Sequence, residues 1–535
     1  MEFKYYKNLC FLLLFISVSL KISMSSPILD NSSGRHGPAS VETRRADNDD
    51  YMRKRQELIL AEKQQRVGGE IVLNDAEKLV DSRLLAMKQK EIDSAHYNAS
   101  NFAPQMSFLL SKELYDQSDV FKMIKSMPKG GALHVHDCSI TDLRWLVSNA
   151  TYRDNCYMCF DSNNQISFHF FDKAPLNPAC PWVPVKTQRE NSGNVLKFDD
   201  MLVQSMLLTK DFADKDINTV WRKFEQILMR ANGLINYKPV FVDYFYEAMK
   251  EFHADNVQYI EIRALLPKVY ELDGTTLQPV DVMNLYKDTT LQFVKDYPDF
   301  TGVKIIKTNL RFKKPDDILV DIKDSINMMK QFPEHFAGYD LVGQEDPGKT
   351  LLYYLDALRY PSLQTPPLTL PYFFHAGETD WEGTRVDDNL FDAVLLNTTR
   401  IGHGYAIPKH PEVMKIVKQK NIAIEVNPIS NQVLKLVSDI LNHPATVLLS
   451  NGSPVVISSD DPAVWGATGL SYDFYAAFMA MTGKEDGLKV LKQLSMNSLL
   501  YSALSPTEKT SALKSWETKW NDFISQMVSS PSFIG

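Results

Sequence analysis

Three histidines and one aspartate could bind a single metal ion. His134 and His136 are separated by one residue in a short apolar run that predicts a β-strand, and alternate residues of a strand face the same side. His375 and Asp460 each follow a further run of this kind. An isolated His-x-His pair often arises by chance. Three imidazoles and a carboxylate at strand ends instead indicate one Zn²⁺ per subunit, with a position left for water or substrate.

Two residues near these ligands could transfer protons. Glu378 lies three residues after His375, where it could act as a proton donor. His403 lies in Ile-Gly-His-Gly at the end of another predicted strand, where it could orient or deprotonate metal-bound water. Taken alone, His403 is more readily explained as a hydrogen-bonded structural histidine. The four ligands nearby favour the catalytic role.

Short β-rich runs recur along the chain and must position these side chains. Between most of them lie 20 to 45 residues with helical periodicity, the spacing of βα units in a parallel sheet. Eight such runs predict an α/β fold, a (β/α)8 TIM barrel over residues 119–535, with its active site at the carboxyl ends of the strands. The predicted strands are 132–135, 259–262, 303–306, 336–342, 372–374, 400–402, 422–426 and 454–457.

The first 118 residues differ from this pattern. Residues 1–25 have the layout of a secretory signal peptide, and their apolar stretch is shorter than the roughly 20 residues that a membrane anchor needs. Residues 26–118 comprise a polar, flexible leader to about residue 50 and then a helical region. Asn74 is its clearest N-cap. This region has no core of its own and must pack on the main domain or on another chain. Its apolar stripe is Ala76, Leu79, Val80, Leu84 and Met87.

The first two predicted strands are separated by an unusually long gap. Residues 149–205 contain several prolines and three cysteines, so we expect a small domain inserted after the first strand and stapled by a disulfide. Once a signal peptide is removed, four cysteines remain and allow three full pairings. They are Cys138, Cys156, Cys159 and Cys180.

Composition restricts the partners. The chain has 535 residues, 44% hydrophobic and 23% charged, which excludes wholesale disorder and allows a sizeable core. A formal net charge of −8 argues against nucleic acid as a general partner. No stretch after the signal predicts a transmembrane helix. Sequons at Asn98, Asn149 and Asn397 are compatible with glycosylation in a secreted protein.

The motifs resemble those of the adenosine deaminases. They are His134-Val-His-Asp, His375-Ala-Gly-Glu, Ile-Gly-His403-Gly and Ser-Ser-Asp460-Asp-Pro. The signal peptide, the helical N-terminal region, the insertion and Met127-Pro-Lys-Gly-Gly are similar to the secreted branch, the adenosine deaminase 2 and adenosine deaminase-related growth factor family. The resemblance covers nearly everything after about residue 50.

The resemblance implies a hydrolytic deamination. The zinc ligands would be His134, His136, His375 and Asp460. Hydroxide formed on the metal would attack C6 of adenosine, with His403 positioning the water and taking its proton. Glu378 would protonate N1, Asp461 would meet N7, and the backbone N–H of Gly343 would meet N3. Ammonia would then leave and inosine would remain.

The resemblance also assigns the sugar contacts, with one departure. Asp137, Trp221 and Glu225 would hold the ribose. A histidine is expected after the third strand, but this chain has Leu310 there. The departure leaves the zinc chemistry intact and changes how the sugar is held.

Further implications concern the assembled, exported protein. The family pattern pairs Cys159 with Cys180 and leaves Cys138 and Cys156 free. The helical region would form a homodimer. The inserted domain, 149–205, would bind a cell-surface receptor or a glycosaminoglycan, and the protein would act outside the cell as a growth factor by depleting adenosine.

Other functions fit the sequence less well. Two-metal barrel hydrolases need a lysine after the fourth strand, where this chain has Gly343-Gln-Glu. The cytidine-deaminase class needs His-x-Glu followed by Pro-Cys-x-x-Cys, which is absent. An AMP deaminase would be expected in the cytosol, and the predicted signal peptide argues against that location. A secreted receptor-binding ligand with secondary or no catalysis is the alternative of another class. The six filled catalytic positions favour an enzyme.

Overall fold

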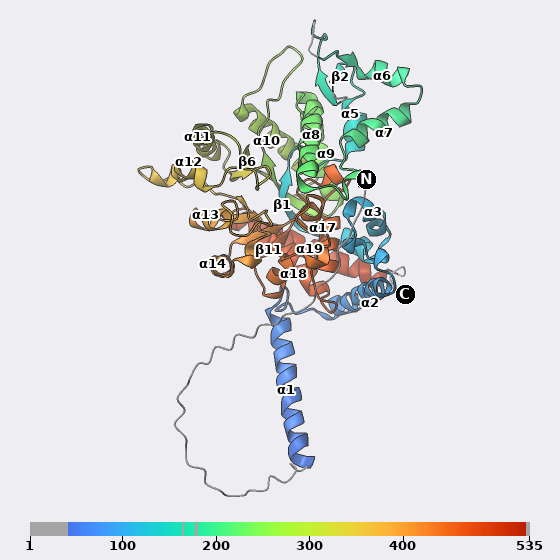
Figure 1. The fold of residues 1–535 in the computed structure, drawn as a ribbon, viewed down its shortest axis with the longest axis vertical. Helices are drawn as coiled ribbons and strands as arrows, with labels where there is room; N and C mark the ends of the chain where they lie inside the picture. Colours follow the sequence, from blue (N-terminus) through green and yellow to red (C-terminus); the bar gives the residue numbers. More distant parts are fainter. Residues whose placement is uncertain (1–40, 163–164, 177–179, 531–535) are drawn as a thin grey trace, which may run out of the picture. The chain divides into compact units, whose positions relative to one another are not determined.

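The computed structural model describes residues 41–162, 165–176 and 180–530 (Figure 1). The predicted signal peptide and the first part of the leader, residues 1–40, lie outside these ranges. The chain divides into two units, Met1–Ile59 and Leu60–Gly535. In the described ranges, no helix is both apolar enough and long enough to cross a membrane.

Eight parallel strands form a ring in the larger unit. One sheet has the order β1-β5-β6-β7 and the other β11-β10-β9-β8. Isolated parallel bridges between Val135 and Asp460 and between Tyr339 and Tyr372 join the two sheets at both seams. The strands are β1 (Gly130–His136), β5 (Val257–Ala264), β6 (Gly302–Leu310), β7 (Phe336–Val342), β8 (His375–Ala376), β9 (Arg400–His403), β10 (Ala423–Val426) and β11 (Val455–Ile457).

The strands lie close to their predicted positions, with one shift. The run at 372–374 was expected to be the fifth strand, but Tyr372 makes only an isolated bridge and the regular strand β8 begins at His375. All residues of β5, β7, β9, β10 and β11 are buried. Strands covered on both faces read as continuous apolar runs, which is why periodicity found them.

Helices alternate with these strands and cover the outside of the ring. Five of them begin with proline at their first position, where the missing N–H costs nothing: α10 (Pro279–Asp296), α11 (Pro315–Gln331), α14 (Pro411–Lys420), α15 (Pro428–Val433) and α19 (Pro506–Ser529). The others around the ring are α8 (Ile217–Ile235), α9 (Lys238–Ala254), α12 (Leu355–Arg359), α13 (Asn389–Leu395), α16 (Ala445–Ser450), α17 (Ser471–Ala480) and α18 (Leu488–Leu500).

The first helix begins earlier than the sequence predicts. Helix α1 (Val41–Gln65) includes residues 41–50, which were expected to belong to the flexible leader. Residues 41–50 have no apolar period, but ion pairs one turn apart support the helix that continues from them. Asp50 pairs with Arg53 and with Lys54 at 2.7 Å, and Arg53 with Glu57 at 2.6 Å.

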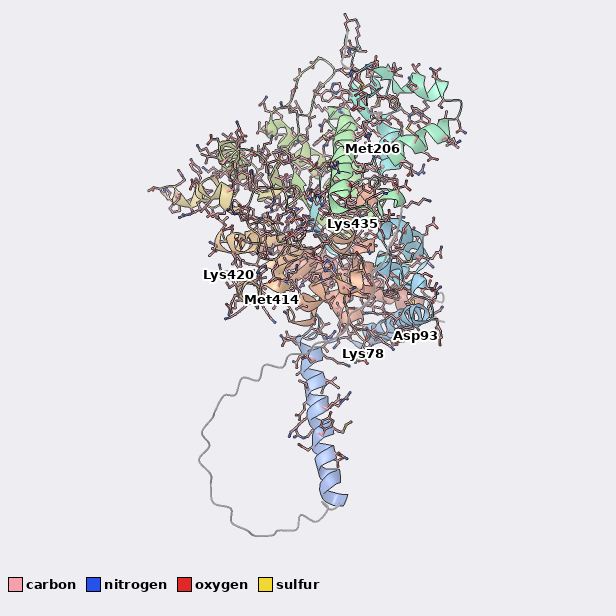
Figure 2. The ribbon with its side chains drawn as sticks, viewed as in Figure 1. Lys78, Asp93, Met206, Met414, Lys420 and Lys435 are labelled. Carbon is pink, nitrogen blue, oxygen red and sulfur yellow. A yellow bond between two sulfur atoms is a disulfide. The ribbon has the colours of Figure 1, made fainter. Side chains whose placement is uncertain are left out.

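Helix α2 (Asp75–Tyr97) starts as predicted, and its buried face includes Val80 and Leu84 of the predicted stripe but is shifted around the helix. Asn74 caps it in a capping box with Glu77. The buried residues are Glu77, Val80, Leu84 and Lys88, whereas Ala76 and Leu79 of the predicted stripe are exposed. Lys78 and Asp93 lie on the solvent side of the helix (Figure 2).

Two buried charges hold α2 on the C-terminal helices of the same chain. Glu77 accepts hydrogen bonds from Trp520 of α19 at 2.8 Å and from Lys492 of α18 at 2.5 Å. Lys88 donates to the Thr482 hydroxyl and to the Gly483 carbonyl, both at 2.8 Å. These partners lie some 400 residues away, so helical periodicity favoured Leu79 over the two charged residues. The helical region therefore packs on the main domain.

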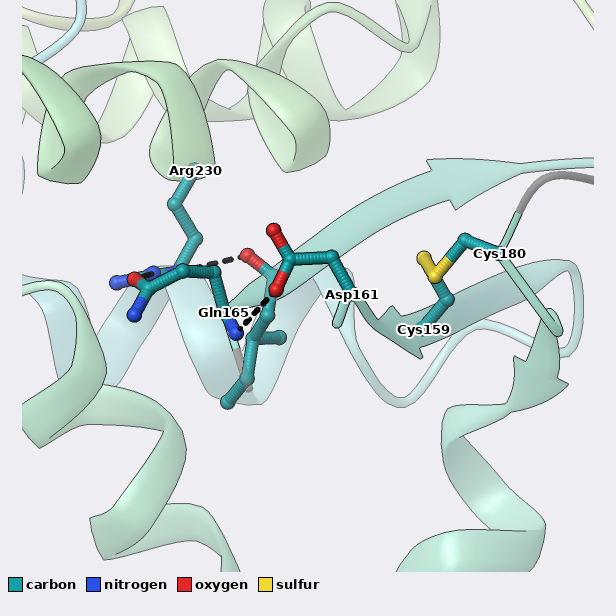
Figure 3. Close-up of a disulfide and its surroundings, with 6 residues drawn as sticks. Cys159, Asp161, Gln165, Cys180 and Arg230 are labelled. Carbon is teal, nitrogen blue, oxygen red and sulfur yellow. Dashed lines mark hydrogen bonds between the residues drawn. A yellow bond between two sulfur atoms is a disulfide. The ribbon is translucent and has the colours of Figure 1, made fainter. Parts of the chain in front are cut away.

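The insertion after β1 contains helices and a small sheet. Strands β2 (Cys156–Phe160), β3 (Ile166–Phe170) and β4 (Val183–Pro184) pair antiparallel in the order β3-β2-β4. Helices α5 (Leu143–Ala150), α6 (Val185–Asn191) and α7 (Val195–Ser205) flank it. Arg230 of α8 donates to the Ile166 carbonyl at 2.8 Å and to Gln165 at 2.9 Å (Figure 3).

The disulfide forms between the predicted cysteines. Cys159 and Cys180 are bonded (Figure 3). Cys138 and Cys156 are free and buried. The sequons at Asn98 and Asn397 are exposed, and Asn149 is half-buried and accepts a hydrogen bond from Arg153 at 2.8 Å.

Candidate active site

Four side chains from three strand ends converge on one point. His134 and His136 both project from β1, His375 begins β8, and Asp460 follows β11. One ligand atom from each lies within 4.8 Å of all the others. Asp460 Oδ1 is 3.3 Å from His134 Nε2 and 3.0 Å from His136 Nε2. These are the four ligands that the sequence predicts, and the structure brings them together.

The chemistry of this donor set fits a metal ion. His134 Nε2 and Asp460 Oδ1 are fully buried, and neither has a hydrogen-bond partner. Buried polar atoms without partners are rare in folded proteins and call for an ion or water. Three imidazoles and a carboxylate are a common ligand set for zinc.

Carboxylates behind the imidazoles determine which nitrogen faces the centre. Glu425 Oε2 lies 2.7 Å from Nδ1 of His134, and Asp340 Oδ2 lies 2.6 Å from Nδ1 of His375. An ionised carboxylate only accepts, so each Nδ1 carries the proton and each Nε2 keeps its lone pair for a metal.

Two buried arginines keep these carboxylates ionised. Arg263 Nε donates to Asp340 at 2.8 Å and its Nη2 donates to Glu425 at 2.6 Å. Arg400 Nε donates to Glu425 at 2.6 Å and its Nη2 donates to Glu261 at 2.5 Å. Burial alone raises the pKa of Glu425, but the two arginines outweigh burial and hold that pKa well below its usual value.

The charged residues behind the imidazoles are not among the site residues predicted from the sequence. Arg263, Asp340, Arg400 and Glu425 are charged residues in strands whose residues are all buried. A charge within such a run is the available signal, because a buried charge requires a partner. The sequence does not tell which strands supply those partners.

Close approach of the backbone shapes the site. A side chain at Gly402 would place its Cβ 3.0 Å from His134 Cε1 and 3.2 Å from the His375 Cα. Only glycine leaves room for the ligand imidazoles against β9. The glycine before His403 therefore serves packing of the ligands as well as the turn.

Glu378 and His403 face the ligand cluster from the ends of two neighbouring strands, β8 and β9. Glu378 Oε1 lies 3.6 Å from His403 Nδ1, and both side chains are buried. Burial and then the charges of Asp460 and Glu345 raise the pKa of Glu378 well above its usual value, which keeps its proton at neutral pH. Burial lowers the pKa of His403 well below its usual value, so the imidazole is neutral.

A pocket opens from this cluster toward α8. It is lined by the five residues predicted to bind substrate, together with Glu378, His403 and Leu310. Those five are Asp137, Trp221, Glu225, Gly343 and Asp461. Trp221, Phe224, Glu225 and Leu228 recur at helical spacing and present one face of α8 to the pocket.

Two aspartates of this pocket, Asp137 and Asp461, have a raised pKa. Asp137 accepts a hydrogen bond from the Tyr286 hydroxyl at 3.0 Å, and burial raises its pKa to about 6. The Ser139 hydroxyl donates to Asp461. Burial raises the pKa of Asp461 to about 7. Leu228, Leu265 and Leu310 contribute apolar side chains to the same lining.

Sequence comparison identifies relatives along most of the chain. The family described as "Adenosine deaminase" matches residues 205–518, and the family described as "Adenosine/AMP deaminase N-terminal" matches residues 13–124. Adenosine deaminase 2-A of Danio rerio is 45% identical over 477 residues, 88% of this chain and 93% of that protein. Adenosine deaminase 2 of Homo sapiens is 44% identical over 479 residues, 89% of this chain and 93% of that protein.

Solved structures share the fold at lower identity. The Arabidopsis ADAL protein, crystallised with IMP, is 18% identical with a TM-score of 0.52 and matches 75% of this chain and 99% of its own. An adenine deaminase from Arthrobacter aurescens is also 18% identical, with a TM-score of 0.51 over 74% of this chain and 99% of its own. At this identity the likeness establishes the fold alone. From the sequence relatives, which match nearly nine-tenths of its length, the chain belongs to the adenosine deaminase 2 family.

Proposed function

We propose that the protein is a zinc-dependent adenosine deaminase, which hydrolyses adenosine and 2′-deoxyadenosine to the corresponding inosines and ammonia. The observation that carries the proposal is the convergence of His134, His136, His375 and Asp460 beside a protonated Glu378 in one pocket. The family supports adenosine as the substrate. One zinc ion per subunit fits the single group of ligands in the described residues.

Zinc, when bound by these four residues, lowers the pKa of a coordinated water from about 15.7 toward 7 and so makes a nucleophile available at neutral pH. The chain's own residues do the rest. Glu378, neutral through burial, is placed to give its proton to N1 of the purine as oxygen adds to C6. His403 orients the attacking oxygen. The bond from C6 to the amino group then breaks: the hydroxyl proton on the oxygen added at C6 passes to the amino nitrogen, which leaves as ammonia, and that oxygen becomes the carbonyl of inosine. N1 keeps the proton from Glu378, and the other proton of the attacking water restores Glu378.

The remaining substrate contacts follow from the pocket. Asp461 meets N7, which it can do as a hydrogen-bond donor because burial holds its pKa near 7. Gly343 has φ 104°, a conformation that brings its backbone N–H toward N3 without a side chain in the way. Asp137, Trp221 and Glu225 line the part of the pocket that would hold the sugar.

The setting of the reaction is part of the proposal. A signal peptide at 1–25, a disulfide and three sequons support secretion and an extracellular role as a growth factor acting through adenosine depletion. Glycosylation is proposed at Asn98, Asn149 and Asn397. The chain would form a homodimer through its helical region on the (β/α)8 barrel, and the insertion 149–205 would contact a receptor or glycosaminoglycan.

Direct assay tests the proposal. Purified secreted protein is incubated with adenosine, and conversion to inosine is followed before chelation, after chelation and after zinc is restored. We expect inosine and ammonia in equal amounts, activity lost on chelation and regained with zinc. Zinc-loaded protein that leaves adenosine unchanged would refute the function.

A further inference from the structure

Two buried side chains connect His403 to a backbone N–H outside the pocket. Asn431 lies in α15 and His443 lies two residues before α16. Asn431 is 0% exposed and His443 is 1% exposed. Asn431 Nδ2 lies 3.0 Å from His403 Nδ1, and Asn431 Oδ1 lies 2.9 Å from His443 Nε2. None of these contacts was singled out in the sequence.

The direction of the hydrogen bonds is set at the far end. The backbone N–H of Ala445 lies 3.1 Å from His443 Nδ1, and a backbone N–H can only donate. His443 Nδ1 is therefore an acceptor without a proton. Burial lowers the pKa of His443 to about 3, so its ring is neutral and its single proton is on Nε2.

The remaining bonds follow in order. His443 Nε2–H donates to Asn431 Oδ1, which fixes the orientation of the amide. Asn431 Nδ2–H must then donate to His403 Nδ1. Because that nitrogen accepts, the proton of neutral His403 lies on Nε2. His403 Nε2 is 3.8 Å from Asp460 Oδ2 and faces the ligand cluster.

We propose that Asn431 and His443 are positioning residues that hold His403 as the Nε2–H tautomer, so that it enters the site as a hydrogen-bond donor and cannot serve as a metal ligand. The argument rests on the proposed function for the identity of the reaction. The expectation that His403 takes a proton from water requires a bare Nε2, which this arrangement does not present. A donor at this point stabilises negative charge on the attacking oxygen instead.

The neighbouring imidazoles provide an internal comparison. Glu425 and Asp340 accept from Nδ1 of His134 and His375, which leaves Nε2 of both rings free to bind a metal. At His403 the partner is an amide that donates, so the ring carries its proton on the opposite nitrogen. The type of partner behind each ring thus separates two ligands from one non-ligand within a space of about 5 Å, since the rings of His134 and His403 are 4.8 Å apart.

Substitution at Asn431 tests the assignment. Asn431→Asp replaces the donor by an acceptor of nearly equal size, which forces the His403 proton to Nδ1. Asn431→Leu removes both bonds without imposing a direction. The matched control is Asn497→Asp, which alters another buried asparagine, whose amide donates to the Val455 carbonyl at 2.8 Å.

Two readouts are needed. In ¹⁵N-histidine-labelled protein, long-range proton–nitrogen spectra show which ring nitrogen carries the proton, and the His403 signals are identified by their loss in His403→Gln. We expect Nε2–H in the parent and the control, and Nδ1–H in Asn431→Asp. In zinc-loaded protein, we expect Asn431→Asp to lower kcat by about tenfold or more, with KM for adenosine within about threefold. Asn431→Leu should show a smaller fall.

The outcomes separate this proposal from the proposed function. A parent protein that does not deaminate adenosine refutes the function, while the spectra still report the tautomer. An active parent with His403 protonated on Nδ1 overturns the relay, as does Asn431→Asp with a kcat within twofold of the parent. Asn431→Asp placed in a His403→Ala background should cause no further loss; an undiminished loss there also overturns it. If Asn431→Asp does not fold, Asn431→Leu carries the same tests of kcat and of the double variant.

Discussion

Asp460 and His403 follow or end different strands, yet both have left-handed backbone conformations, with φ of 59° and 58°. Asp460 Oδ2 lies 3.8 Å from His403 Nε2. For residues other than glycine, such conformations cost about 1–3 kcal/mol each and persist where the surroundings impose them. The ring of strands therefore holds Asp460 and His403 in backbone conformations that such residues rarely adopt.

Glu378→Gln should separate metal binding from catalysis. Glutamine keeps the size of the side chain but cannot release a proton to N1. We expect deamination to fall by about 10²-fold or more, in line with general acid catalysis. Zinc content, measured by atomic absorption, should equal that of the parent. Near-normal turnover in zinc-loaded protein would remove Glu378 from the mechanism.

Asp460→Ala and His134→Ala should lose metal and activity together. Each variant removes one of four ligands, and the remaining three cannot complete the predicted coordination. Zinc content after dialysis and turnover measured on the same sample should fall in parallel. A variant that retains stoichiometric zinc would show that the substituted residue is not a ligand.

Leu310→His should change substrate affinity more than turnover. Leu310 lines the pocket, where histidine could donate a hydrogen bond to a ribose hydroxyl. One neutral hydrogen bond is worth about 0.5–1.5 kcal/mol, so KM for adenosine should fall by up to about tenfold with kcat nearly constant. The effect should shrink for an analogue that lacks the hydroxyl concerned. Unchanged KM for every nucleoside tested would contradict the prediction.

The mature chain should be a dimer that depends on the N-terminal residues. Tyr51, Met52 and Leu58 of α1 are 66%, 56% and 65% exposed, an apolar surface that a second copy could cover. Helix α2 is buried on its own chain, so the informative deletion ends at residue 59 rather than within α2. Light scattering at micromolar concentration should give a dimer for the full mature chain and a smaller mass for the deletion. A monomeric full-length chain would disprove dimerisation.

Removing the disulfide should destabilise the insertion. Cys159 and Cys180 are 21 residues apart, and a crosslink of this span contributes about 3 kcal/mol by restricting the unfolded chain. The double variant Cys159→Ser and Cys180→Ser should show earlier proteolysis within residues 149–205, while the active-site geometry is unaffected. A peptide map of the parent that places Cys156 in a disulfide would contradict the pairing itself.

Much of the site could be predicted because short sequence patterns around its residues indicate where they lie. The two-residue period of a strand predicts that His134 and His136 face the same side. Asp460 follows an apolar run, which predicts a buried strand before it. The strand positions were predictable for the same reason. Local pattern was sufficient wherever one strand alone determines where a side chain points.

What could not be predicted depends on contacts between distant segments. The burial of Glu77 and Lys88 is set by partners near the C-terminus, so the amphipathic pattern of α2 identified Val80 and Leu84 but missed the two buried charges. The same holds for Asn431, which looks like an ordinary polar residue of a short helix until His403 and His443 are placed beside it.

The contacts of Glu425 affect the thermal stability of the folded chain. It accepts from Arg263 and Arg400 and also from the metal-facing imidazole of His134, so one carboxylate ties together strands β1, β5, β9 and β10. Any ion held by His134 favours the arrangement in which this tie is complete, and a ligand that binds only the folded chain raises its stability in proportion to the logarithm of its free concentration. The melting temperature should therefore rise with the concentration of added zinc, even in protein whose catalytic acid has been removed.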